Sequence, residues 1–324
     1  MAACWQPPIA CRAVASPSAL CLSAWLGERL PPPWAEGLPV QRLSPVGGGC
    51  IHAAWKLELV GGGCLFAKGG GAQALPMLQA EAEGLRALAE AAAGTGLTLP
   101  LPLALGELDG QALLVLSWLE LGGRGSAQAW AALGAALARM HRASTALNRS
   151  RGYGFDADNF IGSARQANGW LPEWGPFFAE RRLAPQLEQL QRRGVRLVGS
   201  TQLLEMVPSW LAQHGTEPVL VHGDLWSGNA GLLAAGGGAI FDPATHWADR
   251  EVDLAMARLF GGFPAAFFSG YGREWPLPAG AEQRVQLYNL YHLLNHANLF
   301  DGGPGGSYGR QAQASLQTLL STLG

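Results

Sequence analysis

The stretch VHGDLWSGN, residues 221–229, decides how the rest of this chain is interpreted. It places Asp224 two residues after His222, and Asn229 follows five residues beyond Asp224. A second carboxylate, Asp242, ends a short apolar run at residues 239–241. Metal-assisted phosphoryl transfer to a hydroxyl needs this set, because one carboxylate accepts the hydroxyl proton while an amide oxygen and another carboxylate hold Mg²⁺. The pattern therefore indicates that kind of chemistry.

The spacing also predicts a local structure that would bring these side chains together. A strand at 218–221 is expected to turn at Gly223, present Asp224 and re-enter regular structure after Asn229. Residues 231–234 and 238–242 then form a hairpin closed by an Ala-Gly-Gly turn, which carries Asp242 back beside Asn229. Two oxygen ligands from different strand ends could then share one hard cation. The alternative is a capped loop and an unrelated surface aspartate.

Three features upstream suit nucleotide binding. Residues 44–52 form a glycine-rich turn whose Gly47, Gly48 and Gly49 would let backbone approach phosphates closely, although such a turn is often only a hairpin. A predicted strand at 64–68 ends in Lys68, one of only two lysines in the chain, and a compact ammonium suits phosphate. A predicted helix follows at 75–93.

In that helix, Glu81 is favoured as the partner of Lys68, against the alternative of a solvated surface charge. A buried strand is predicted at 113–118. The glycine-containing segment LGGRG, residues 121–125, is then interpreted as a hinge between two lobes. Ser117, Trp118 and Leu119 are expected to bind the nucleotide beside this hinge.

The second half of the chain is predicted to be mostly helical. The expected helices are 126–141, with Ser126 as N-cap, followed by 174–191, 202–213, 252–260 and 282–300. His292 and His296 are candidates for contacting the acceptor, with a hydrogen-bonded core histidine as the alternative. Asp253 is interpreted as a brace for the catalytic loop. Trp226 is expected to line the acceptor site, unless its ring packs against the protein beneath.

Composition agrees with two lobes of a catalytic unit. The chain has 324 residues, 48% of them apolar, and its net charge of −2 argues against a nucleic-acid surface. No apolar run is long enough for a membrane span. All five cysteines fall in the first 64 residues without framework spacing, which favours a reducing compartment and a cytoplasmic protein. A transit peptide at the N-terminus is the weaker alternative.

The chain resembles the fructosamine-3-kinase (ketosamine-3-kinase) family, within the aminoglycoside-phosphotransferase-like, protein-kinase-like fold. The resemblance extends over about residues 39–320. The motifs that carry it are PVGGGCI (45–51), EAEGLRAL (81–88), YGFDADNFIG (153–162), NGW (168–170), FFAERRLAPQL (177–187), HGDLWSGN (222–229), FDPA (241–244), REVDLAMARLFGGFP (250–264) and LYNLYHLLNHANLF (287–300). Residues 1–18 have no counterpart, and the segment 301–308, DGGPGGSY, is looser than the tails of the family.

The resemblance implies an α+β fold with a small β-rich N-lobe at 19–121, containing one long helix, and a mostly helical C-lobe at 122–324. It implies an ATP- and Mg²⁺-dependent kinase that phosphorylates the O3 hydroxyl of ribulosamines, erythrulosamines or fructosamines, so that the amine is freed. By matching motif, Asp224 is the base, Asn229 and Asp242 are the Mg²⁺ ligands, and Lys68 with Glu81 is the phosphate-binding pair.

Alternatives from other classes remain at this point. One is a kinase of the same fold that takes an aminoglycoside or choline, and another is a non-catalytic protein that binds nucleotide. The expected partner is a free or protein-bound sugar-amine, with neither nucleic acid nor membrane involved. The chain is expected to be a monomer or a redox-dependent dimer, the latter through oxidation of Cys50 in the glycine-rich turn.

Overall fold

The computed structural model describes residues 16–47 and 51–323. The chain divides into two compact units, which are described separately. The first comprises residues up to Arg86 together with Pro100–Glu120, and the second comprises Ala87–Leu99 and Leu121–Gly324. The segment 87–99 belongs to the second unit although it lies inside the range 19–121, because its strand pairs there and Arg139 donates to the carbonyl of Thr95 at 2.9 Å.

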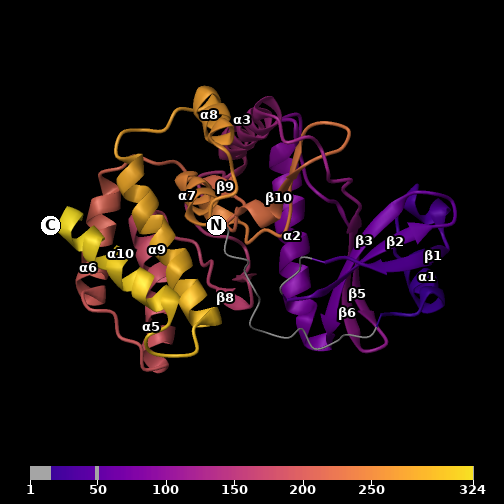
Figure 1. Cartoon of the computed structure of the whole chain (residues 1–324), viewed down its shortest axis with the longest axis horizontal. Helices are drawn as coiled ribbons and strands as arrows, with labels where there is room; N and C mark the ends of the chain where they lie inside the picture. The colour runs from indigo at the N-terminus through magenta and orange to yellow at the C-terminus, as the bar shows by residue number, and fades with distance from the viewer. Residues whose placement is uncertain (1–15, 48–50, 324) are drawn as a thin grey trace. The chain divides into compact units, whose positions relative to one another are not determined.

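The first unit is built on an antiparallel sheet with the strand order β1-β2-β3-β6-β5 (Figure 1). Its strands are β1 (Val40–Pro45), β2 (Ala53–Leu59), β3 (Cys64–Gly71), β5 (Pro102–Leu108) and β6 (Gln111–Ser117). The glycine-rich turn therefore joins two paired strands, as predicted, although residues 48–50 lie outside the described part. The sheet supplies a rigid frame for Lys68.

The two faces of this sheet are covered by different helices. Side chains alternate along β3, so Leu65 and Ala67 join the core that includes Trp25 and Leu26 of α1 (Ala19–Gly27). Lys68 points to the opposite face, where it meets Glu81 on α2 (Leu75–Ala92). The helix predicted at 75–93 is thus confirmed, whereas α1 and β5 had no expected counterpart.

The sequence predicted that β3 ends at Lys68, but the strand continues to Gly71. Its pairing with β6 runs on through Gly69↔Leu113 to Gly71↔Gln111. The hydrogen bonds between β3 and β6 are made by backbone groups, so three glycines in a row can continue the strand. At Gly69 the absence is required, because a Cβ would lie 2.7 Å from a methyl of Leu113 and 2.9 Å from the carbonyl of Ala112.

The second unit is mostly helical, as predicted (Figure 1). Its α-helices are α3 (Ala127–Ser144), α4 (Trp174–Phe177), α5 (Ala184–Arg192), α6 (Ser200–Ala212), α7 (Glu251–Leu259), α8 (Ala265–Glu274), α9 (Ala281–Phe300) and α10 (Ser307–Leu323). Ser126 caps α3, since its hydroxyl accepts a hydrogen bond from the N–H of Ala129 at 3.1 Å. None of the helices described is long and apolar enough to cross a membrane.

The helix predicted at 174–191 is interrupted by a π-helical segment, Phe178–Leu183, between α4 and α5. Pro185 supplies a physical reason, because it has no N–H to donate to the carbonyl of Arg181 four residues earlier. That carbonyl accepts a hydrogen bond from the guanidinium of Arg182 instead, at 3.0 Å. The Arg182 side chain thus satisfies this carbonyl in place of a backbone N–H.

Short strands complete the second unit. They are β4 (Leu97–Thr98), β7 (Asn159–Ile161), β8 (Ala164–Gln166), β9 (Val219–Val221), β10 (Ala230–Leu232), β11 (Gly238–Ile240) and β12 (His246–Ala248). β10 and β11 form the predicted antiparallel hairpin, with Ala230 opposite Ile240. β9 pairs with β12. These two pairs frame the loop 222–229.

Candidate active site

The loop that carries Asp224 leaves β9 through a turn that only glycine can make. Gly223 has φ +81°, and a Cβ there would lie 2.2 Å from the carbonyl oxygen of Ala244. The close approach is fixed by a hydrogen bond from the N–H of Ala244 to the carbonyl of His222, at 2.9 Å. Asp224 is therefore presented at a defined point just after the strand.

Asp253, in the first turn of α7, holds this loop in place through hydrogen bonds. The sequence predicted the same role for it. Its fully buried carboxylate accepts hydrogen bonds from the N–H groups of His222 and Gly223, both at 2.8 Å. It also contacts Nε2 of His141 at 3.1 Å. Burial alone would raise the pKa of Asp253, but the interactions with His141, His222 and Gly223 outweigh it and lower that pKa. Asp253 thus stays ionised and positions the loop.

His222 is a structural member of the loop. Its Nε2 lies 2.8 Å from the carbonyl oxygen of Phe241, and its Nδ1 accepts a hydrogen bond from the N–H of Asp224 at 3.3 Å. This arrangement corresponds to the neutral tautomer with the proton on Nε2. Burial lowers the pKa of His222, which also favours the neutral ring. The imidazole ties the catalytic loop to the end of the hairpin that bears Asp242.

Asn229 joins Asp224 to Asp242. Its side-chain Nδ2 donates to the carbonyl of Asp224 at 2.9 Å, to the carboxylate of Asp224 at 3.4 Å and to the carbonyl of Asp242 at 3.3 Å. Asp242 itself adopts φ +57°, a left-handed conformation that is uncommon outside glycine and typical of constrained sites. The structure therefore gathers the three residues that the sequence singled out.

The electrostatics of Asp224 fit a proton acceptor. The residue is half-buried, and burial raises its pKa to about 7, with the carboxylates of Asp242 and Asp253 adding to the rise. The hydrogen bond from Asn229 opposes this shift. A carboxylate whose pKa lies near neutrality is matched to general base catalysis at physiological pH.

The donor set fits a hard divalent cation. Because Nδ2 of Asn229 is directed at Asp224 and Asp242, its amide oxygen is the atom left to bind a metal. Asp242 is exposed, and its charge is close enough to Asp224 to raise the pKa of that residue. Amide and carboxylate oxygens are the ligands that Mg²⁺ prefers. Asn229 and Asp242 are therefore the residues that would hold it.

The first unit contains the predicted phosphate-binding pair. Nζ of Lys68 lies 2.8 Å from Oε1 and 2.9 Å from Oε2 of Glu81. The two side chains are only 7% and 11% exposed, so the pair is largely shielded from solvent. Lys68 and Glu81 thus come together as the sequence predicted, and Glu81 is not a solvated surface charge.

The other predicted nucleotide contacts have more varied surroundings. Gly48 and Gly49 lie outside the described residues, and so does Cys50, while Gly47 is described in the turn after β1. Ser117 uses its hydroxyl to accept a hydrogen bond from the N–H of Leu101 at 2.8 Å, which joins the ends of β5 and β6.

Trp118 and Leu119 follow β6 and are half-buried. The ammonium of Lys56 lies 4.7 Å from the centre of the Trp118 ring. The indole N–H donates to Glu120 at 2.7 Å. Their role in binding nucleotide remains a prediction.

The predicted acceptor residues also differ among themselves. Trp226 is half-buried, and its indole lies over Gly228, where a Cβ would be 2.2 Å from the ring. His292 is fully buried, and neither ring nitrogen has a hydrogen-bond partner among the described residues. The Nδ1–H of His296 donates to the carbonyl of His292 at 2.8 Å, and the ring lies among Phe260, Phe300 and Tyr308.

These surroundings place the ring of His292 in the core, whereas His296 is half-buried on the same helix. Of the hydrogen-bonded core histidine considered from the sequence, His296 has the hydrogen bond but is only half-buried. His292 is instead a core histidine whose ring is unpaired, and burial lowers its pKa to about 3. Contact of either residue with an acceptor remains a prediction, and Trp226 is the better placed of the three.

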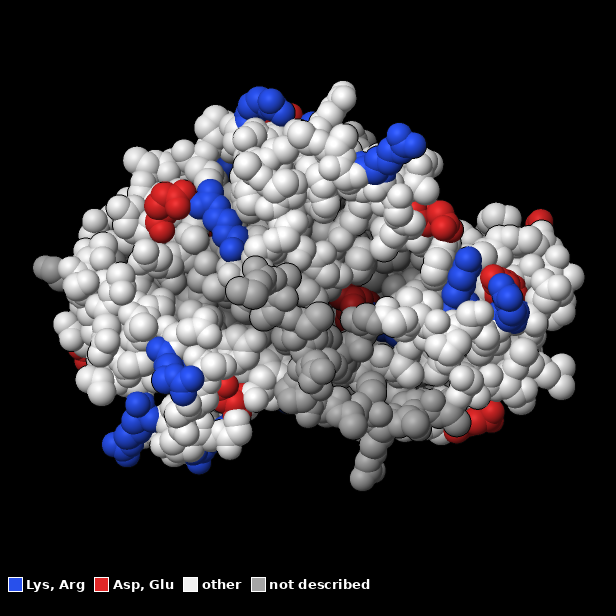
Figure 2. Space-filling view, viewed as in Figure 1, with Lys and Arg blue, Asp and Glu red and all other residues white. Residues whose placement is uncertain are grey.

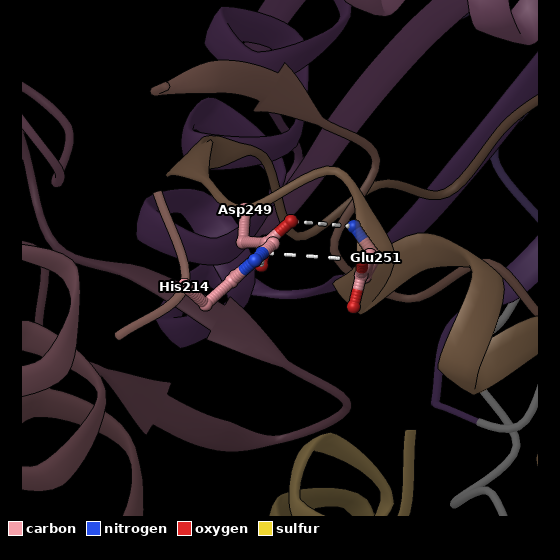
Figure 3. A group of neighbouring side chains, drawn as sticks. All are labelled: His214, Asp249 and Glu251. Atoms are coloured by element: carbon pink, nitrogen blue, oxygen red, sulfur yellow. Dashed lines mark hydrogen bonds and ion pairs between the residues drawn. The ribbon is translucent and has the colours of Figure 1, made fainter. Parts of the chain in front are cut away.

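A second group of potential metal ligands, His214, Asp249 and Glu251, lies at the start of α7 (Figure 3). Its oxygens are already engaged. Both carboxylate oxygens of Glu251 accept from Arg284, at 2.7 and 2.8 Å, and Asp249 accepts from Tyr288 at 2.7 Å and contacts His214 at 2.9 Å. The group therefore ties α7 to α9 and to the end of α6, and we do not assign it a metal.

Sequence reasoning missed most partners of Asp253 and Asp249. His141 lies 112 residues from Asp253, and Tyr288 lies 39 residues from Asp249. Arg284, the partner of the neighbouring Glu251, lies 33 residues from it, and no local pattern links any of these pairs. The one available signal was the density of charge in REVDLAMAR, residues 250–258, within an otherwise apolar helix.

The chain as a whole matches the fructosamine kinase family over residues 34–322. The chain belongs to this family. A Synechocystis protein named a probable ketoamine kinase is 42% identical over 281 residues, covering 87% of this chain and 91% of its own. The Arabidopsis thaliana chloroplastic protein-ribulosamine 3-kinase is 36% identical over 269 residues, covering 82% of this chain and 79% of its own.

A solved structure agrees with these relatives. A Haemophilus somnus protein assigned as a fructosamine-3-kinase superposes with a TM-score of 0.80 at 26% identity, covering 92% of this chain and 96% of that one. The fold is the protein-kinase-like fold that aminoglycoside phosphotransferases share. The fold class and family expected from the sequence are therefore confirmed, and the protein is a phosphotransferase of the ketosamine kinase type.

Proposed function

We propose that this protein transfers the γ-phosphate of ATP to the O3 hydroxyl of a ketosamine, a sugar joined to an amine through a ketoamine. The observation that carries the proposal is the Asp224 carboxylate, held beside Asn229 and Asp242 in a loop that Asp253 braces. The family and the name of the Arabidopsis relative support the substrate class.

Each residue has a role in this proposal. Asp224 accepts the proton of the attacking hydroxyl, to which its pKa near neutrality is suited. Asn229 and Asp242 hold Mg²⁺, which supplies positive charge to the phosphates. Lys68, fixed by Glu81, binds the α- and β-phosphates. Trp226 offers an apolar ring to the carbon face of the sugar. The O3 phosphate then makes the adduct unstable and frees the amine, which is a deglycation step.

The test is ADP release with ribulosyl-, erythrulosyl- and fructosyl-lysine, each free and within a peptide, together with an aminoglycoside and choline. We expect turnover of at least one ketosamine, with phosphate at O3 by NMR, and none of the other two acceptors. Asp224→Asn should lower turnover by about 10²–10⁴ while ATP binding persists. Phosphorylation of choline or the aminoglycoside alone, or more than a tenth of wild-type turnover in Asp224→Asn, would reject the proposal.

A further inference from the structure

The second unit has a cavity of about 420 Å³ well away in sequence from the catalytic loop. Three segments line it: the residues after α5, which include Arg193 and Arg196, the loop between α9 and α10, and the first turn of α10, which includes Arg310. DGGPGGSY, residues 301–308, forms this loop and the start of α10, and it is the segment that is looser than the tails of the family. We call this feature the basic cleft, and the kinase machinery described above uses none of its residues.

The basic cleft concentrates positive charge in a chain that is slightly acidic. Three guanidinium groups, those of Arg193, Arg196 and Arg310, line it, against one carboxylate, Asp301. The chain as a whole has 22 basic and 24 acidic residues, so this local excess is not a general property of the protein. Figure 2 shows basic side chains gathered at the lower left, where Figure 1 places α5.

The carboxylate of the basic cleft already accepts hydrogen bonds from backbone N–H groups. Two of the three arginines donate to backbone carbonyls of the residues that form the walls. Asp301 accepts hydrogen bonds from the backbone N–H groups of Tyr308 and Gly309, at 3.4 and 2.7 Å, at the start of α10. Arg193 donates to the carbonyls of Ala297 and Asp301, and Arg310 donates to the carbonyl of Gly305. Carbonyl groups fix these guanidinium groups in place but do not neutralise their charge.

Arg196 differs from the other two arginines. It is exposed, and neither its guanidinium nor its backbone N–H and C=O makes a hydrogen bond or an ion pair with another described residue. Pro304, on the facing loop, lines the same cleft. Val198, two residues after Arg196 in the sequence, is an apolar side chain that is 75% exposed. One side of the basic cleft therefore offers charge, main-chain groups and apolar surface together.

We propose that the basic cleft binds an acidic peptide segment of a partner protein. Guanidinium groups recognise carboxylates with paired hydrogen bonds, and exposed main-chain groups are typical sites for a peptide backbone. Several exposed guanidinium groups spread around an open cavity suit a row of carboxylates better than one small anion, for which a buried charged side chain would be expected. The recognition is independent of phosphoryl transfer.

The experiment measures fluorescence anisotropy of a labelled peptide of eight glutamates, with an eight-lysine peptide as control. We expect the full-length protein to bind the acidic peptide only, and more weakly as salt rises. Arg196→Glu should weaken binding about tenfold or more, and Val198→Asp, which adds negative charge on an exposed position, should act in the same direction. Neither side chain has a partner within the protein, so the thermal unfolding temperature should not change.

Arg273→Glu is the matched control, because Arg273 is exposed on α8, has no ion pair among the described residues, and undergoes the same change of charge. It should leave binding within twofold of wild type. Equal weakening in Arg273→Glu and Arg196→Glu would overturn the proposal, since binding would then follow net charge. Displacement of the peptide by submillimolar inorganic phosphate would also overturn it, in favour of a small-anion site.

Discussion

Asp224 makes the pH dependence of stability a direct test of its surroundings. Its pKa is about 7 in the folded protein, against about 4 in an unfolded chain. Between these values the folded state binds a proton that the unfolded state releases, so this group's contribution is present at low pH and is lost as pH rises through 7. Without Mg²⁺ and ATP, Asp224→Asn should therefore be more stable than wild type at pH 8, by roughly 1–3 kcal/mol.

Urea unfolding at several pH values measures this difference, which should shrink toward pH 4. Glu205→Gln is the control, because Glu205 is exposed on α6 and the change also removes one carboxylate. An Asp224→Asn variant that gains nothing at pH 8 would show that the carboxylate is solvated.

Trp226 and Gly228 can be tested as one unit. Because a Cβ at residue 228 would lie 2.2 Å from the indole, Gly228→Ala should displace the ring without straining the backbone. Both Gly228→Ala and Trp226→Ala should raise KM for the sugar-amine about tenfold, with KM for ATP nearly unchanged. Adding Gly228→Ala to Trp226→Ala should have little further effect. If KM for both substrates rises, or the protein unfolds, Trp226 is a packing residue and the acceptor site lies elsewhere.

At the scale of elements, the Lys68–Glu81 pair links strand β3 to helix α2. Both side chains are largely buried, so Glu81→Leu would take a carboxylate away from a shielded ammonium group and should cost about 3–5 kcal/mol of stability. The double variant Lys68→Met with Glu81→Leu should recover most of that loss, although it should be inactive. Chemical denaturation distinguishes these outcomes. Equal stability of the single and double variants would mean that the pair is not coupled.

Elements with a strong local signal were predictable from the sequence. The helix at 75–93 and the hairpin at 230–240 have clear periodicity or turn residues, and they form nearly as expected. β4 was not predictable, because two residues at 97–98 become a strand only by pairing with β11, about 140 residues later. The π-helical segment depends on Pro185 and the neighbouring Arg182 together, and a periodic pattern does not record that combination.

For the site, spacing within one loop and the hairpin that follows it was sufficient for Asp224, Asn229 and Asp242. Sequence spacing was insufficient for the buried residues that hold this loop in place. The contact of His141 with Asp253 spans 112 positions and forms only when α3 and α7 pack in the same unit. Sequence left His292 open between an acceptor contact and a core histidine, because its burial is set by the packing of α9.

At the scale of the whole molecule, each unit carries part of the proposed nucleotide machinery, Lys68 in the first and Asp242 in the second. ATP with Mg²⁺ at a hundredfold excess over Kd should stabilise the wild type by about 2.7 kcal/mol. Asp242→Ala should abolish this gain, and Lys68→Arg should reduce it because a planar fork replaces a point charge. Thermal shift with and without Mg²⁺ is the measurement. Full stabilisation of Asp242→Ala would remove its role as a ligand.

The carboxylate of Asp253 has a consequence for hydrogen exchange. Loop amides normally exchange with solvent quickly, because local fluctuations expose them at little cost. The N–H groups of His222 and Gly223 are bound instead to a side chain inside a buried helix, so they can exchange only when α7 itself moves away. The first two amides of the catalytic loop should therefore exchange as slowly as those of the helix core, and the rest of the loop should not.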